Sequence, residues 1–240
     1  MAKQPGIKEV IEYNRHTINA TFADLRSLRR INTMNSLRHG LTKEAHNLFQ
    51  YPDYLPEEDR DLYLDYTTIE NLGPAWDYIL EHVSEKIDML QIRRLHTILA
   101  MNTDIPGGQY RFSDAYIEQL QQNAPTYHQM LYKLDDVEYS LGNRAIPVLN
   151  RAFNAHYDII AAQPFNDFNK RTARLVMNWF LLQNAYSPIL FTAKSDKTEY
   201  MSTLRARADG HCKVYSHYLY KCMARTQNEI IKILTRSKTL

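Results

Sequence analysis

The sequence has 240 residues, of which 44% are apolar and 23% are charged, and its formal net charge is +2. This balance is typical of a globular protein and excludes an intrinsically disordered chain, a collagen and an extended coiled coil. The small net charge gives no reason to expect a nucleic acid or an anionic membrane surface as a partner.

Helices are predicted along most of the chain, because its 7 glycines and 9 prolines leave long segments free of both residues. The predicted helices cover residues 7–30, 42–49, 57–65, 74–83, 87–101, 127–140, 144–162, 170–184, 195–207 and 213–236. Pro147 is expected in the first turn of its helix, where its missing N–H breaks no hydrogen bond. The turn signal Pro106-Gly107-Gly108 predicts a tight turn or a short hairpin. The expected fold class is therefore all-α with one small hairpin at most.

The cellular location is inferred from three features of the sequence. No uninterrupted apolar run approaches the roughly 18 residues of a membrane span, and residues 1–14 lack the apolar stretch of a signal peptide. Two cysteines are too few for a disulfide framework. We expect a cytoplasmic protein without membrane contact, and delivery into another cell by a route that needs no such signal stays open.

The stretch Gln163-Pro-Phe-Asn-Asp-Phe-Asn-Lys-Arg-Thr-Ala-Arg174 carries the chemistry, and it lies between two apolar helices. A short loop that leads into a helix offers backbone N–H groups and positive dipole character, which suit a phosphate. Asp167 supplies a carboxylate of the kind that Mg²⁺ prefers. Lys170, Arg171 and Arg174 oppose the helix dipole unless an anion arrives. The spacing indicates either a phosphate site or a solvated basic turn beside an aspartate salt bridge.

The same stretch resembles the signature of the Fic/Doc domain, His-x-Phe-x-Asp/Glu-Gly-Asn-Gly/Lys-Arg-x-x-Arg. The matching positions are Phe165, Asp167, Asn169, Lys170, Arg171 and Arg174. Residues 156–160 resemble the lead-in helix of that family, and residues 108–111 resemble the Gly-x-Tyr-Arg that follows its target-docking flap.

The resemblance implies a bundle of helices with a small β-hairpin flap, to which Gly108, Tyr110 and Arg111 are assigned. It places a Fic-like domain at residues 59–207. Residues 1–58 are then an N-terminal helical extension, and residues 208–240 a C-terminal helix packed on the domain.

By resemblance, the activity would be transfer of AMP from ATP to a protein hydroxyl, or phosphate transfer as in Doc-type proteins, which also carry Lys at the position of Lys170. The implied ligands are ATP or another nucleotide with Mg²⁺, and the implied partner is a target protein that bears a hydroxyl side chain. Asp167 would hold Mg²⁺, the backbone of residues 168–170 would cradle the phosphates, and Arg171 and Arg174 would clamp them. Asn169 is carried over as a catalytic-motif residue.

Two positions depart from the signature. Gln163 replaces the histidine that removes the proton from the attacking hydroxyl, and an amide has no usable basicity near neutral pH, while loss of a general base alone typically costs about 10²–10⁴ in rate. Phe168 replaces a glycine that permits positive φ and close approach of the backbone to phosphate. We therefore predict nucleotide binding with weak or lost transferase activity. Two alternatives stay open: an active transferase with a changed donor or Doc-like chemistry, and a non-enzymatic regulatory or binding protein; self-association is also left open.

Two further residues are candidates for a role in the reaction. His156 lies about two helical turns, or roughly 10 Å, before Gln163, so we expect a packed, hydrogen-bonded histidine rather than a substitute base. Glu70 and Asn71 match part of the family's inhibitory motif Ser/Thr-x-x-x-Glu-Gly/Asn, whose Glu would pair with Arg174. A capping box at the start of a helix explains the same residues equally well.

Overall fold

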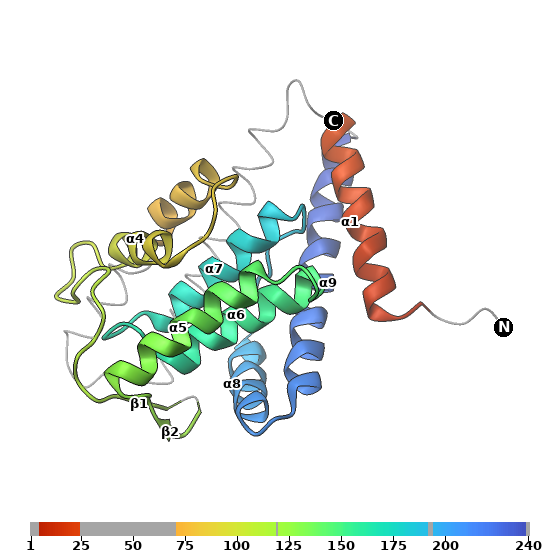
Figure 1. Ribbon diagram of the computed structural model, residues 1–240. Helices are drawn as coiled ribbons and strands as arrows, with labels where there is room; N and C mark the ends of the chain where they lie inside the picture. Colours follow the sequence, from red (N-terminus) through yellow and green to blue (C-terminus); the bar gives the residue numbers. More distant parts are fainter. Residues whose placement is uncertain (1–4, 25–70, 119, 192–193, 239–240) are drawn as a thin grey trace.

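The structure is a computed structural model that describes residues 5–24, 71–118, 120–191 and 194–238 (Figure 1). Its helices are α1 (Ile7–Asp24), a helix over residues 71–81, α4 (Met89–Leu99), α5 (Tyr127–Gly142), α6 (Val148–Ala162), α7 (Asn169–Gln183), α8 (Lys194–Ala208) and α9 (Cys212–Lys238). The strands β1 (Tyr116–Ile117) and β2 (Gln122–Asn123) pair antiparallel, with Tyr116 opposite Asn123. The predicted fold class, all-α with one small hairpin, is confirmed.

Most predicted helices appear with ends shifted by a few residues, and one predicted helix needs correction. The helix predicted from residue 144 begins instead at Val148, because Pro147 adopts extended backbone angles and becomes the N-cap residue. Of the tight turn or short hairpin predicted at Pro106-Gly107-Gly108, the structure has the turn, and the hairpin lies later in the chain, at residues 116–123. The helices predicted at residues 42–49 and 57–65 lie outside the described residues.

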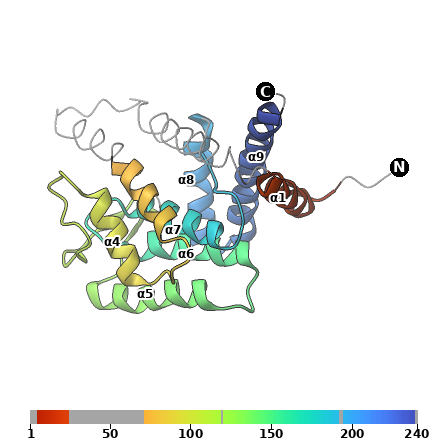
Figure 2. The same ribbon diagram turned by 90° about the horizontal axis from the view of Figure 1, so that it is seen from above.

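The core is built around α6 and α7, which pack against each other, while α5 covers the other side of α6 (Figure 2). Buried apolar residues occur on every side of α7, among them Ala173, Val176, Met177, Trp179 and Leu181. A helix that is apolar all round belongs in the interior of a domain. The loop that precedes α7 is thereby fixed at both of its ends by the core.

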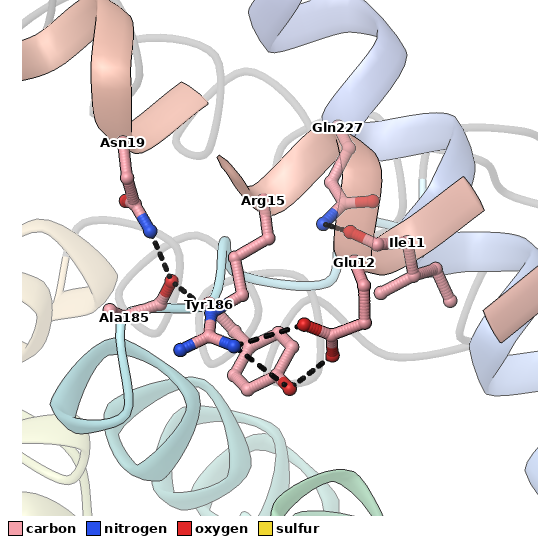
Figure 3. Close-up of polar contacts among 7 residues, drawn as sticks. All are labelled: Ile11, Glu12, Arg15, Asn19, Ala185, Tyr186 and Gln227. Atoms are coloured by element: carbon pink, nitrogen blue, oxygen red, sulfur yellow. Dashed lines mark hydrogen bonds and ion pairs between the residues drawn. The ribbon is translucent and has the colours of Figure 1, made fainter. Parts of the chain in front are cut away.

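The N-terminal helix α1 packs against α9 at the edge of the bundle. Gln227 of α9 donates to the carbonyl of Ile11 (3.2 Å), and Asn14 donates to Asn228 (3.1 Å). Figure 3 shows that α1 also reaches the turn after α7, where Arg15 and Tyr186 meet. None of the helices in the described part of the chain is long and apolar enough to cross a membrane.

Candidate functional site

The loop between α6 and α7 begins and ends with a residue in the left-handed region. Gln163 ends α6 with φ 47° and ψ 59°, and Phe168 precedes α7 with φ 58° and ψ 13°. This conformation costs roughly 1–2 kcal/mol for a residue with a side chain. A bulky side chain at position 168 is expected to hinder a positive φ, yet Phe168 adopts one. The surrounding contacts must therefore hold this residue in the left-handed conformation.

Asn169 holds the loop from the first position of α7. Its side chain accepts a hydrogen bond from the N–H of Phe165 (2.9 Å) and donates one to the carbonyl of the same residue (2.8 Å). Asn169 is buried, and its side-chain oxygen and nitrogen are both engaged with Phe165. In this structure Asn169 orders the backbone of the loop.

His96, on α4, is the site residue that the sequence reasoning missed. Its Nδ1 accepts a hydrogen bond from the N–H of Gly108 (2.9 Å), and its Nε2 lies 3.0 Å from the carbonyl oxygen of Asp167. Its ring stacks on Phe165 at a centroid distance of 3.8 Å. Burial lowers the pKa of His96 to about 4, so the neutral ring accepts at Nδ1 and donates from Nε2. His96 connects the segment that contains Gly108 to the loop that contains Asp167. In the sequence, only its place on the apolar face of α4 indicates that it is buried.

Gly108 can only be a glycine in this arrangement. Its φ is 67°, and an added Cβ would lie 2.5 Å from Thr97 Oγ1 and 2.8 Å from the carbonyl oxygen of Arg93. Arg93 donates to the carbonyl of Gly108 (2.6 Å), and its guanidinium lies 5.1 Å from the ring centroid of Tyr110. The segment before the hairpin is thus packed tightly onto α4.

Arg111 is buried behind the loop, and its side chain caps the C-terminal end of α6. Its guanidinium donates to the carbonyl oxygens of Gln163 (2.6 Å), Ser113 (2.9 Å), Pro125 (2.5 Å) and Ala162 (3.5 Å). Its own N–H donates to the carbonyl of Pro164 (3.0 Å). A cation at the last carbonyls of a helix is favourable. Burial lowers the pKa of Arg111 below its usual value.

The flap assignment differs from the prediction. Gly108, Tyr110 and Arg111 precede β1 and are not strand residues. The reason is that Gly108 is bonded to α4 and Arg111 to the end of α6, so this segment pairs with neither strand of the hairpin.

The three predicted cations gather at the start of α7. Burial first, and then the charges of Arg174 and Arg171, lower the pKa of Lys170 to about 8, while Asp167 and Glu118 oppose the shift. Glu118, which lies between β1 and β2, is the hairpin residue whose charge acts on Lys170. The Arg171 guanidinium lies 4.9 Å from the ring centroid of Phe168.

Asp167 is exposed beside these cations. Its carboxylate accepts the N–H of Phe168 (2.5 Å), and its carbonyl accepts from His96. Within the described ranges, no group of three or more His, Cys, Asp or Glu residues is arranged to hold a metal ion. A lone carboxylate fits Mg²⁺ that shares its other positions with water and substrate phosphates.

Two predictions remain, a packed role for His156 and an inhibitory or capping role for Glu70. His156 is buried and hydrogen-bonded through both ring nitrogens, to Tyr215 (2.5 Å) and Tyr200 (3.0 Å), as expected for a packed histidine. Glu70 lies outside the described residues. Its neighbour Asn71 donates to the carbonyls of Leu99 (3.0 Å) and Met101 (2.6 Å), and so closes the C-terminal end of α4.

Comparison with protein families and curated proteins gives one consistent result. A family model described as Fic/DOC family matches residues 86–181. The protein adenylyltransferase fic-1 of Caenorhabditis briggsae is 28% identical over 145 residues, which are 59% of this chain and 28% of that protein. The protein adenylyltransferase Fic of Drosophila melanogaster is 25% identical over 166 residues, 68% of this chain and 34% of that protein. The chain thus spans about a third or less of the length of these relatives.

Solved structures resemble this chain in fold. A Fic domain containing signaling protein from Bacteroides thetaiotaomicron has a TM-score of 0.70 at 17% identity, covering 92% of this chain and 97% of that chain. A Fic family protein from Desulfovibrio desulfuricans has a TM-score of 0.70 at 16% identity, covering 99% of this chain and 76% of that chain.

Proposed function

Because residues 86–181 of this chain form a Fic/DOC family domain, we propose that the loop before α7 binds the phosphates of a nucleotide with Mg²⁺, ATP being the first candidate. The observation that carries the proposal is the start of α7. Phe168 offers no side-chain cap there, and Lys170, Arg171 and Arg174 surround it. A helix N-terminus with clustered cations suits a phosphate chain.

Each residue of the loop has a part in this proposal. Arg171 and Arg174 would clamp the phosphates, and Asp167 would hold Mg²⁺, which neutralises phosphate charge when it is bound. His96 and Asn169 hold the loop backbone in place before the ligand arrives. Such preorganisation means that little ordering of the protein accompanies binding.

The weak step of the proposed reaction is removal of a proton from the target hydroxyl. Gln163 stands where the related transferases are expected to carry their base, and an amide neither gains nor loses a proton near neutral pH. We therefore propose binding with transfer activity far below that of the related adenylyltransferases. A protein that binds nucleotide and transfers nothing is the second candidate function, and it rests on this same residue.

Calorimetric titration with ATP, ADP and AMP, each with and without Mg²⁺, tests the binding. We expect the tightest binding for ATP with Mg²⁺, and a loss of affinity in Arg171→Ala/Arg174→Ala. The matched control is Arg94→Ala/Lys133→Ala, which removes the same charge from exposed positions. An absence of heat at millimolar nucleotide, or equal losses in both double variants, contradicts the proposal.

Self-modification with labelled ATP tests the role of Gln163. We predict that Gln163→His raises the rate by about 10²–10⁴, because an imidazole titrates near neutral pH. A wild-type rate equal to that of the variant shows that another group removes the proton. Transfer by neither protein, when both bind ATP, favours the non-enzymatic function.

Glu70 is proposed as an inhibitory residue that pairs with Arg174. Glu70→Gly then tightens ATP binding. If Glu70 only caps a helix, the change instead lowers the free energy of unfolding by about 0.5–2 kcal/mol and leaves the affinity unchanged.

A further inference from the structure

A cluster of buried aromatic residues lies behind the motif arginines, where α6, α7, α8 and α9 meet. The guanidinium carbon of Arg174 lies 4.8 Å from the ring centroid of Phe191 and 4.8 Å from that of Tyr200. The two rings are 5.1 Å apart, and both residues are buried. Two rings against one guanidinium in a desolvated setting form a favourable cation–π arrangement.

Hydrogen bonds connect this cluster to α6. Tyr215 donates to the carbonyl of Phe153 (3.1 Å), so its oxygen is free to accept the Nδ1–H of His156 (2.5 Å). The other ring nitrogen of His156 then carries a lone pair and accepts the hydroxyl proton of Tyr200 (3.0 Å). The hydroxyl of Tyr200 is thereby turned so that its oxygen can accept from Arg174.

The charge state of the cluster agrees with this assignment. Burial and the charge of Arg174 lower the pKa of His156 to about 3, so its ring stays neutral. Burial raises the pKa of Tyr200, and the charge of Arg174 together with a hydrogen bond from it opposes the rise. Arg174 is therefore held by two rings and by one oriented hydroxyl, while its Nε has no hydrogen-bond partner within the described residues.

We propose that Tyr200, oriented by His156 and Tyr215, is a positioning residue that fixes the guanidinium of Arg174 at the phosphate site before a nucleotide arrives. An arginine side chain has many rotamers, and ordering it in advance removes that loss of entropy from the binding step. Phe191, Tyr200 and Tyr215 all lie after residue 181, where the family match ends. The segment that follows the matched domain thus completes the arginine side of the site. The consequence for nucleotide binding rests on the proposed function, whereas the positioning itself does not.

The first experiment observes the Arg174 side chain in the nucleotide-free protein. Its Nε–H resonance is assigned by its disappearance in Arg174→Lys, and its order parameter is measured by ¹⁵N relaxation. We expect an ordered side chain in the wild type, a disordered one in Tyr200→Leu and an intermediate one in Tyr200→Phe, which keeps the ring. The matched control is Tyr220→Leu, which removes a buried ring and one hydrogen bond, to Asn150. Equal order of Arg174 in the wild type and in a folded Tyr200→Leu, or in Tyr200→Phe where Tyr200→Leu does not fold, overturns the proposal.

The second experiment compares the affinities for ATP and AMP. We expect Tyr200→Leu to weaken ATP binding about tenfold, AMP binding less, and neither further once Arg174→Ala is present. Loss of order in Arg174 with unchanged ATP affinity overturns the inference that this positioning serves the site. If the wild type binds no nucleotide, the proposed function fails, and the relaxation experiment alone decides whether Tyr200 positions Arg174.

Discussion

The two ends of α7 are closed by residues of the same backbone conformation, which are retained for different reasons. Phe168 before the helix and Ala185 after it both have a φ of 58°. Glycine is the residue that such positions favour, because a Cβ is strained there. The comparison of the two ends separates what a backbone requires from what a side chain supplies.

At the C-terminal end of α7, the backbone alone accounts for the conformation. The N–H of Tyr186 donates to the carbonyl of Leu181 (2.9 Å), and that of Ala185 donates to Leu182 (3.0 Å). This pair of hydrogen bonds is the Schellman arrangement that usually contains a glycine. Figure 3 shows Arg15 and Asn19 of α1 donating to the carbonyl of Ala185 (3.3 and 3.1 Å). The methyl group of Ala185 has no evident part in these contacts.

At the N-terminal end, the side chain explains the residue. Phe168 is 2% exposed, and its ring contacts both His96, at a centroid distance of 6.1 Å, and the guanidinium of Arg171, at 4.9 Å. Burying a phenylalanine side chain gains more than the left-handed backbone costs. A residue can therefore be retained at a strained backbone position because its side chain stabilises the fold, and Phe168 in the motif loop is such a residue.

The largest expected effect comes from Arg111, which holds the loop at the N-terminal end of α7 in place. Arg111→Leu removes a buried side chain that donates to four carbonyl groups, and we predict a loss of about 5 kcal/mol in the free energy of unfolding. Urea unfolding measures it, with Arg93→Leu as a control, because Arg93 is exposed and contacts the segment before the hairpin through the carbonyl of Gly108 and the ring of Tyr110. Equal losses in the two variants would show that the buried bonds of Arg111 have no special weight.

Phe168 tests the comparison directly. Phe168→Ala removes the buried ring and keeps the strain, so we predict a loss of about 4 kcal/mol. Phe168→Gly removes both, and we predict a loss of about 3 kcal/mol, since glycine adopts a φ of 58° without strain. Thermal and urea unfolding measure the two values. An alanine variant at least as stable as the glycine variant contradicts the assignment of backbone strain.

His96 contributes to the pH dependence of stability, and His156, whose pKa burial lowers to about 3, contributes in the same direction. The pKa of His96 falls from 6.5 to about 4 on folding, so the unfolded chain binds a proton that the folded chain excludes. The stabilisation is complete above pH 6.5 and is lost as the pH falls toward 4, by about 3 kcal/mol. Burial raises the pKa of Asp158 to about 6 and so acts in the opposite direction.

The difference between wild type and His96→Gln isolates the contribution of His96, because the amide does not titrate and both His156 and Asp158 are common to the two proteins. We expect unfolding free energies measured from about pH 7.5 to pH 4 to fall more steeply for the wild type. Parallel curves would show that His96 is protonated without penalty in the folded protein.

The smallest effect, of opposite sign, belongs to the C-terminal end. Ala185→Gly relieves the strain and removes no buried ring, so we predict a gain of about 1 kcal/mol in the free energy of unfolding. Thermal unfolding is sufficient to measure it. A loss of stability would mean that the alanine methyl takes part in the contact with α1.

The sequence predicts the parts of this molecule that depend on near neighbours. Helical periodicity places most of the helices. The spacing of Asp167, Arg171 and Arg174 leaves a solvated basic turn open, and it is the resemblance of the whole stretch to a family signature that marks the candidate site. Pro147 is misplaced because its extended backbone angles follow from the loop before it. The two-residue strands are too short to show an alternating pattern.

The supports of the site depend on distant residues, and the sequence cannot predict them. His96 bonds the backbone of Gly108 and of Asp167, 12 and 71 positions away, and any residue type supplies those backbone groups. Tyr200 meets His156 across 44 positions, and one tyrosine among 17 carries no mark of its partner.

The attachment of α1 at the turn shown in Figure 3 has a consequence for the whole chain. Ile11 is fully buried, and the contacts of α1 with α9 and with Tyr186 are all non-covalent. In chemical terms α1 is therefore a ligand of the bundle, joined to it by the polypeptide between Asp24 and Asn71. Because both partners belong to one chain, their association is intramolecular and is governed by an effective concentration rather than by the concentration of the protein. Cutting the chain between Asp24 and Asn71 would make the same contacts depend on the concentrations of two separate molecules.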